Sequence, residues 1–216
     1  MSDSTWIPKT AEWVRDQMEK EGSHDWWHVY RVWQMARHLA EGEEVDQTVV
    51  ELGALLHDIA DHKFHAGDTS VGPRVAAGWL EKIEVPEIII EHVQQIIREV
   101  SFKGANVPDH VTSPETMIVQ DADRLDALGA IGIARTFAYG GSKGRLLYDP
   151  DEPPVLHDNF TAYKSSTAPT INHFYEKLLL LKDRMHTEKA KAIAGQRHRF
   201  MEEYLERFYR EWEGEE

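Results

Sequence analysis

The chain has 216 residues and a mass of 24.9 kDa, a length that fits one domain with a substantial core. Its 38 acidic residues outnumber 24 basic ones, and the formal net charge of -14 disfavours long-range attraction to nucleic acid or to an anionic membrane surface. The absence of cysteine excludes disulfides, thiolate metal ligands and a cysteine nucleophile.

The sequence shows neither an export signal nor a membrane anchor. No basic region followed by an apolar one opens the chain, and no apolar run approaches the ~20 residues that span a bilayer. We therefore expect a cytoplasmic protein that binds neither membranes nor nucleic acid stably. An anionic substrate would have to be attracted locally, by a metal ion and a few basic side chains.

The first informative element is a helix expected around residues 23–35. His24 and His28 lie one helical turn apart in it. The apolar residues available to face a core are Trp27, Val32 and Met35. The spacing predicts that imidazoles are carried on a helix with a buried face.

The second element contains His57 and Asp58 side by side. Apolar residues recur around the pair at helical spacing, namely Leu52, Leu55, Leu56 and Ile59. The pattern places an imidazole and a carboxylate on or beside the buried face of a helix. A buried carboxylate needs a hydrogen bond, an opposite charge or a metal. A histidine and an acid together suit a divalent transition ion, and a core histidine bonded to a neighbouring acid is the structural alternative.

Two prolines mark further helix starts. Pro86 precedes an amphipathic run over residues 87–97, and Pro114 opens a helical segment that continues over residues 121–135. This segment carries Asp121, Asp123 and Asp126 among apolar neighbours, and Gly129 and Gly132 are expected to permit close packing within it. Three separated clusters of acids or imidazoles on apolar helices are hard to explain as solvated surface.

Two irregular stretches are expected, at residues 101–113 and 140–169. The second exceeds an ordinary helix connection, and a lid and a floppy insertion explain it equally well. Thr187 can cap the last helix.

These signals predict an all-α fold of about eight helices, because alternating strand patterns are nearly absent. No linker divides the sequence. We expect a single domain over residues 1–216, with a core over about 20–135 and C-terminal helices over about 169–213 packed on it.

The motifs resemble those of the HD-domain metal-dependent phosphohydrolase superfamily, whose pattern is a His, then a His-Asp pair, then a distant Asp. The matching residues are His28, His57, Asp58 and Asp123. The length resembles the small stand-alone hydrolases of that superfamily, and the similarity extends through residues 126–135 and 172–179. The resemblance implies a single-domain HD-type helical bundle.

The resemblance also implies that His28, His57, Asp58 and Asp123 hold one divalent metal ion per chain. Manganese is favoured, and iron, cobalt, nickel, zinc and magnesium remain open. Such an ion would polarise a phosphoryl oxygen and activate a water molecule for attack. In relatives an acid at the position of Asp61 assists the attacking water or the leaving group, whereas a surface acid or a partner for His57 is the alternative.

Further side chains are candidates for contact with a phosphorylated substrate. They are Lys63, His92, Lys143, Arg145, His173 and Lys177. The basic ones can equally be solvated, and His92 can equally be a core histidine. No second histidine lies near His92, so a mononuclear centre is preferred.

The resemblance implies hydrolysis of a small phosphoester, most readily a nucleotide, by a pyrophosphohydrolase or nucleotidase. A cyclic-nucleotide phosphodiesterase is one alternative. A non-catalytic HD module that binds a nucleotide or a partner protein is another, and a purely structural helical protein is a third. No phosphate-binding P-loop is complete, so ATP-driven chemistry is not expected.

Overall fold

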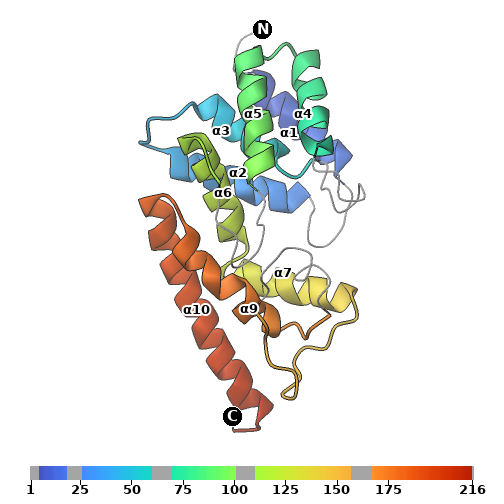
Figure 1. Ribbon diagram of the computed structural model, residues 1–216, viewed down its shortest axis with the longest axis vertical. Coiled ribbons are helices and arrows are strands. Elements are labelled where there is room, and N and C mark those ends of the chain that lie inside the picture. Colours follow the sequence, from blue (N-terminus) through green and yellow to red (C-terminus); the bar gives the residue numbers. More distant parts are fainter. Residues whose placement is uncertain (1–4, 19–25, 60–69, 101–109, 157–166, 216) are drawn as a thin grey trace. The chain divides into compact units, whose positions relative to one another are not determined.

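The computed structural model describes residues 5–18, 26–59, 70–100, 110–156 and 167–215 (Figure 1). The regular structure in these ranges consists of nine α-helices and one 3-10 helix, with no strand. This confirms the predicted all-α fold. Among the same residues, no helix combines the length and the apolar composition needed to cross a membrane.

The chain divides into two compact units. One contains residues 1–102 and 109–123, and the other contains residues 103–108 and 124–216. The division falls within one helix, between Asp123 and Arg124. The expected packing of the C-terminal helices on the core stays a prediction.

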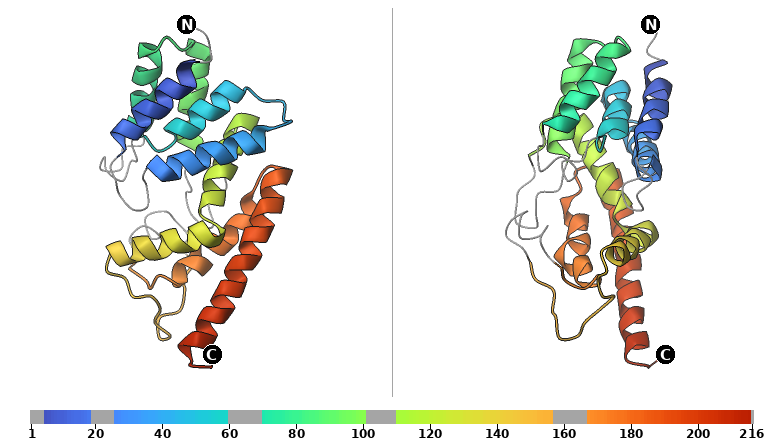
Figure 2. Two further views of the ribbon diagram at one scale, coloured as in Figure 1. Left: turned by 180° about the vertical axis from the view of Figure 1, so that it is seen from behind. Right: turned by 90° about the vertical axis from the view of Figure 1, so that its right-hand side faces the viewer.

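The first unit is built around one central helix, α3, which contacts α1, α2 and α5, while α4 pairs with α5 (Figures 1 and 2). The helices of this unit are α1 (Trp6–Gln17), α2 (Trp26–Ala40), α3 (Gln47–Leu56), α4 (Val71–Lys82), α5 (Glu87–Glu99) and the greater part of α6 (Pro114–Asp126). The helix expected over residues 87–97 is thus confirmed as α5.

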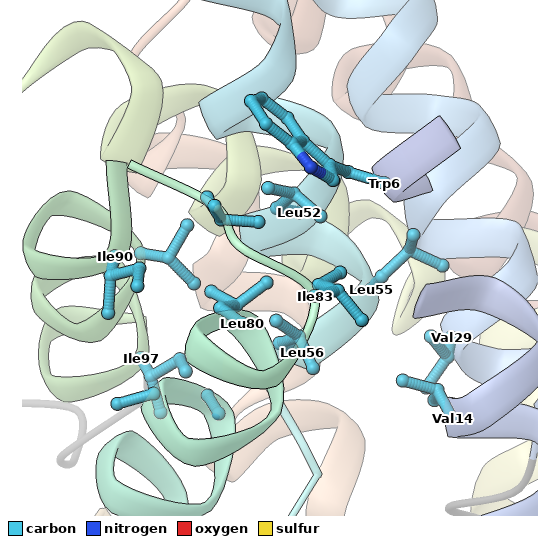
Figure 3. Close-up of a cluster of buried hydrophobic side chains, with 14 residues drawn as sticks. Trp6, Val14, Val29, Leu52, Leu55, Leu56, Leu80, Ile83, Ile90 and Ile97 are labelled. Carbon is cyan, nitrogen blue, oxygen red and sulfur yellow. The ribbon is translucent and has the colours of Figure 1, made fainter. Parts of the chain in front are cut away.

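The core of the first unit explains why α3 is held so firmly. Leu52, Leu55 and Leu56 are fully buried, as their spacing predicts, and meet side chains from α1, α2, α4 and α5 (Figure 3). Each such leucine contributes about 2 kcal/mol through removal of its apolar surface from water. The end of α3, which the His-Asp pair directly follows, is therefore anchored on its apolar side.

The N-terminal end of α3 is fixed by polar contacts. The Asp46 carboxylate accepts hydrogen bonds from the backbone N–H groups of Thr48 and Val49, at 2.9 and 3.2 Å. The N–H of Asp46 itself donates to Glu115 Oε1 at 3.0 Å, which ties α3 to α6. Both ends of α3 are thus held in place.

The single helical segment expected over residues 121–135 is wrong. Helix α6 ends at Asp126 and α7 (Gly129–Ser142) begins three residues later. Gly129 adopts a φ of +72°, a conformation that other residues rarely adopt, and the chain turns there. A Cβ on Gly132 would collide with the backbone of Ala127, so the close packing expected at Gly132 is confirmed.

The second unit contains α7, α9 (Asn172–Glu176), the 3-10 helix η3 (Leu178–Arg184) and the long helix α10 (Glu188–Trp212) (Figure 2). Helix α10 packs against α7 and η3. The Thr187 hydroxyl accepts a hydrogen bond from the N–H of Ala190 at 3.2 Å, which confirms the predicted cap. Phe174 is fully buried and stacks on Tyr204, with ring centroids 6.0 Å apart.

Candidate metal centre

The first unit brings together four side chains from three helices. His28 lies in α2, and His57 and Asp58 follow the last residue of α3. Asp123 lies near the end of α6. The four residues named by the family resemblance are therefore close in space although 95 positions separate the first from the last in the sequence.

The ligand atoms face one another. His28 Nε2 lies 3.3 Å from His57 Nε2 and 3.5 Å from Asp58 Oδ2, and His57 Nε2 lies 3.6 Å from the same oxygen. Asp123 Oδ1 lies 3.4 Å from His28 Nε2 and 3.9 Å from His57 Nε2. Within the described residues, His28, His57 and Asp58 form the one group of three or more potential ligands whose atoms all lie within 4.8 Å of one another.

This spacing fits a metal ion. Nitrogen and oxygen ligands lie about 2.0–2.2 Å from a first-row ion, so two ligands at tetrahedral angles are roughly 3.4 Å apart. The measured separations of 3.3 to 3.9 Å surround that value. Two imidazole nitrogens and two carboxylate oxygens suit a first-row transition ion, and the set does not select one metal.

The orientation of His57 is set by the backbone. His57 Nδ1 donates to the carbonyl oxygen of Ala54 at 2.8 Å, and because a carbonyl accepts only, Nδ1 must carry the proton. Nε2 is then the ring nitrogen that faces the ligand group. The sequence alone did not identify this carbonyl as a partner of His57. The position of Ala54, three residues before a histidine at the end of a helix, is the feature that could have indicated it.

Burial divides the centre into two sides. The His28 and His57 side chains are each 1% exposed, whereas those of Asp58 and Asp123 are 21% and 31% exposed. The imidazoles form a buried floor and the carboxylates form the side that solvent reaches. A site of this form leaves coordination positions for water and a substrate oxygen, unlike a closed structural site.

Asp123 is ionised over the working range of pH. Burial raises the pKa of its carboxyl, but the hydrogen bond from His28 and the charges of His57 and His28 outweigh burial and hold the pKa at about 2. The site therefore stabilises negative charge where a cation would bind.

The other acids of α6 have different surroundings. Asp126 is 5% exposed and pairs with Arg135 at 2.6 Å. Asp121 is fully buried. Arg124, a neighbour of these acids in the sequence, donates to the carbonyl oxygen of Arg184 at 2.6 Å.

His92 and Trp27, two further residues of the first unit, have different surroundings. His92 Nε2 is bonded to Ser113 Oγ at 2.8 Å and lies 3.6 Å from Glu115 Oε2, in a polar network between α5 and the start of α6. Its contact with substrate stays a prediction. Trp27, expected to face the core, is 57% exposed, because adjacent helix positions point about 100° apart and His28 takes the buried direction.

The remaining predicted contacts fall elsewhere. Lys143, Arg145, His173 and Lys177 belong to the second unit, and their contact with substrate stays a prediction. Asp61 and Lys63 lie outside the described residues.

Fold and site together define a class of protein: an all-helical protein in which two histidines and an aspartate form a group that could hold a metal ion. The HD domain family model matches residues 26–128, a range that contains all four ligands. YpgQ from Bacillus subtilis is 36% identical over 195 residues, which cover 89% of this chain and 87% of YpgQ. The chain therefore belongs to the HD-domain family.

Solved structures agree over nearly the whole length. An HD-superfamily hydrolase from Bacillus thuringiensis is 45% identical, with 98% of this chain and 99% of that chain covered and a TM-score of 0.76. A protein from Lactobacillus plantarum is 34% identical, with 99% and 100% covered and a TM-score of 0.85. YpgQ in complex with ADP is 31% identical, with 98% and 97% covered and a TM-score of 0.78.

Proposed function

We propose that this HD-superfamily hydrolase is a metal-dependent phosphohydrolase that cleaves a small nucleotide. The observation that supports the proposal is the close group of His28, His57 and Asp58, with Asp123 Oδ1 only 3.4 Å from His28 Nε2. Two buried imidazoles with carboxylates on the side nearer to solvent are suited to catalysis. A histidine and an acid that only stabilise a core would pair with each other and would need no second pair from distant helices.

The residues of the chain have separate roles in this proposal. When bound, a divalent ion polarises a phosphoryl oxygen and makes water a better nucleophile. Asp58 and Asp123 supply the charge that holds the ion, and His28 and His57 fix its position. The Ala54 carbonyl keeps the His57 ring in the required tautomer.

A nucleotide is proposed as the substrate because the relative YpgQ has been crystallised with ADP. The ADP complex indicates a ligand class and leaves the hydrolysed bond to experiment. Manganese remains the favoured ion on the family resemblance.

An activity screen tests the proposal. The purified chain, supplied in turn with Mn²⁺, Co²⁺, Ni²⁺, Zn²⁺, Fe²⁺ and Mg²⁺, should hydrolyse at least one member of a panel of dNTPs, NTPs, monophosphates and cyclic nucleotides. Asp58→Asn should lose both the bound metal and the activity, because the neutral amide is a poor ligand. Asp183→Asn is the matched control, since that carboxylate is 77% exposed and forms an ion pair with its neighbour Lys182 at 3.1 Å. Turnover by the Asp58 variant at the native rate would remove the centre from the mechanism.

Asp61 is proposed to assist the attacking water, on its place three residues after Asp58 and on the family resemblance. Asp61→Asn should keep the native metal content and lower kcat by roughly 10²-fold or more, the usual contribution of a general acid or base. Metal analysis and steady-state kinetics on one preparation make the comparison. An unchanged kcat would indicate that Asp61 is a surface acid with no part in the reaction.

A further inference from the structure

Basic side chains gather in the second unit of a chain whose net charge is -14. Lys143 and Arg145 follow α7, and His173 and Lys177 lie on and just after α9. The contacts around these residues indicate that they form one cluster, which we call the α9 cationic cluster.

Backbone pairing joins the two chain segments. The N–H and the hydroxyl of Thr170 donate to the carbonyl oxygen of Leu146 at 2.9 and 3.0 Å, and the N–H of Ile171 donates to that of Leu147 at 3.0 Å. Gly140 permits this approach, because a Cβ there would collide with the Thr170 side chain. Arg145 is therefore fixed beside the residues that lead into α9.

Side chains add to the order of the cluster. Lys143 Nζ and the Arg145 guanidinium both lie over the ring of Tyr139, 5.6 and 5.7 Å from its centroid. The N–H of Lys177 donates to the carbonyl oxygen of His173 at 3.1 Å, which places these two residues one turn apart.

Electrostatics within the cluster favour a bound anion. Burial lowers the pKa of His173, and the charges of Lys177 and then Arg145 lower it further, to about 3. Glu176, an acid of the same helix, is buried and accepts a hydrogen bond from the N–H of Val155 at 3.1 Å. The charges of Lys177 and Arg145 both oppose protonation of the His173 ring.

We propose that Arg145, His173 and Lys177 form a binding site for the oxygens of a phosphate chain. An arginine fork, an ammonium and an imidazole N–H offer charge-assisted hydrogen bonds of the kind that phosphate oxygens accept. The phosphate can belong to the nucleotide substrate or to free pyrophosphate. The identity of the natural ligand rests on the proposed function, whereas the site itself does not.

Pyrophosphate is the probe, and calorimetry and NMR are the measurements. Both use the full-length chain carrying Asp58→Asn, freed of metal with a chelator, so that no turnover can occur. Pyrophosphate should bind saturably and should raise the pKa of His173 by about one pH unit or more, because an anion offsets the two cations. The His173→Gln spectrum identifies the ring signal.

Two independent variants test the assignment, because each removes one cation from a different segment. Arg145→Gln and Lys177→Gln should each weaken pyrophosphate binding at least tenfold while circular dichroism stays unchanged. Lys191→Gln should bind normally, since Lys191 is an exposed lysine of α10 that pairs with Glu188. Unchanged affinity in both cluster variants, or a His173 signal that pyrophosphate does not move, would overturn the site.

A second titration identifies the source of the phosphate. If the same variants also weaken binding of a nucleoside triphosphate, the site takes the phosphate chain of a nucleotide. If they weaken pyrophosphate alone, it takes the free ion, and both results support the site. The binding assay contains no metal and measures no turnover. A native chain that hydrolyses nothing would therefore not contradict the anion site, and failure to bind pyrophosphate would not contradict the proposed hydrolysis.

Discussion

Two acids of α6, three residues apart, serve different purposes. Asp123 faces two imidazoles and is 31% exposed, whereas Asp126 is 5% exposed and pairs with Arg135. The contrast shows why sequence spacing alone did not separate them. Asp121, Asp123 and Asp126 are all acids among apolar neighbours, and only the family resemblance singled out Asp123.

Substitution should separate the two roles. Asp126→Asn removes the charge that pairs with the Arg135 guanidinium at 2.6 Å and should lower the free energy of unfolding by about 2 kcal/mol, with metal content unchanged. Asp123→Asn should reduce metal content with a smaller effect on the metal-free stability. Urea unfolding and metal analysis measure the two quantities. The reverse pattern would contradict the assignment of these acids.

The low pKa of His173 predicts a dependence of stability on pH. The folded protein binds the proton only near pH 3, whereas an unfolded histidine binds it near 6.5. Between these values the unfolded state holds more protons, so the contribution of His173 makes stability fall as the pH falls from 6.5 towards 3. Above pH 6.5 it has no effect.

The comparison of native protein with His173→Gln isolates this contribution. The unfolding free energy of the variant should fall less steeply with decreasing pH in the window below 6.5, and the two curves should be parallel above it. Denaturant unfolding at a series of pH values gives both curves. Parallel curves throughout would show that His173 is protonated normally in the folded state.

At the scale of helices, the sequence indicated some helix boundaries correctly and did not indicate others. Pro86 and Thr187 mark starts that the structure confirms, because a proline directly before a helix and a hydroxyl cap act through local chemistry. The break between α6 and α7 was missed because no proline marks it. It depends on the positive φ of Gly129 and on the contact of Gly132 with Ala127, and neither is visible in a periodic pattern.

The close approach at Gly132 leads to a prediction about two helical glycines. Gly132→Ala should destabilise the protein by about 2 kcal/mol, since the added methyl group meets the Ala127 backbone, which cannot move aside without cost. Gly195→Ala in α10 should stabilise it by up to about 1 kcal/mol, because nothing lies within 4 Å of the new atom and alanine favours the helix. Chemical denaturation compares the pair. Equal effects of the two substitutions would refute the packing argument.

At the scale of the whole molecule, the all-α class could be predicted because helical periodicity recurs along the chain and strand signals are nearly absent. The ligand set needed more information. The His57-Asp58 pair was visible because the two residues are adjacent on an apolar run, but no local pattern connects them with His28 or Asp123. Contacts between remote helices are set by tertiary packing, and here the resemblance supplied them.

Metal binding should stabilise the entire folded chain, because the unfolded chain cannot hold four ligands around one point. At an ion concentration 100 times the Kd the gain is about 2.7 kcal/mol, which for a chain of this size corresponds to a rise in Tm of roughly 5–10 °C. Thermal unfolding with and without Mn²⁺ measures it. Asp58→Asn should show no such rise, and an equal rise in that variant would point to binding elsewhere.

The hydrogen bond between His57 and the Ala54 carbonyl has an evolutionary consequence. Many metal-binding histidines are oriented by a side chain, which a single base change can delete. Here the acceptor is part of the peptide backbone, so every amino acid that position 54 tolerates within a helix would present the same oxygen. Substitution at that position can alter packing without disorienting the ring, and the alignment of the His57 ring is inherited with the helix itself.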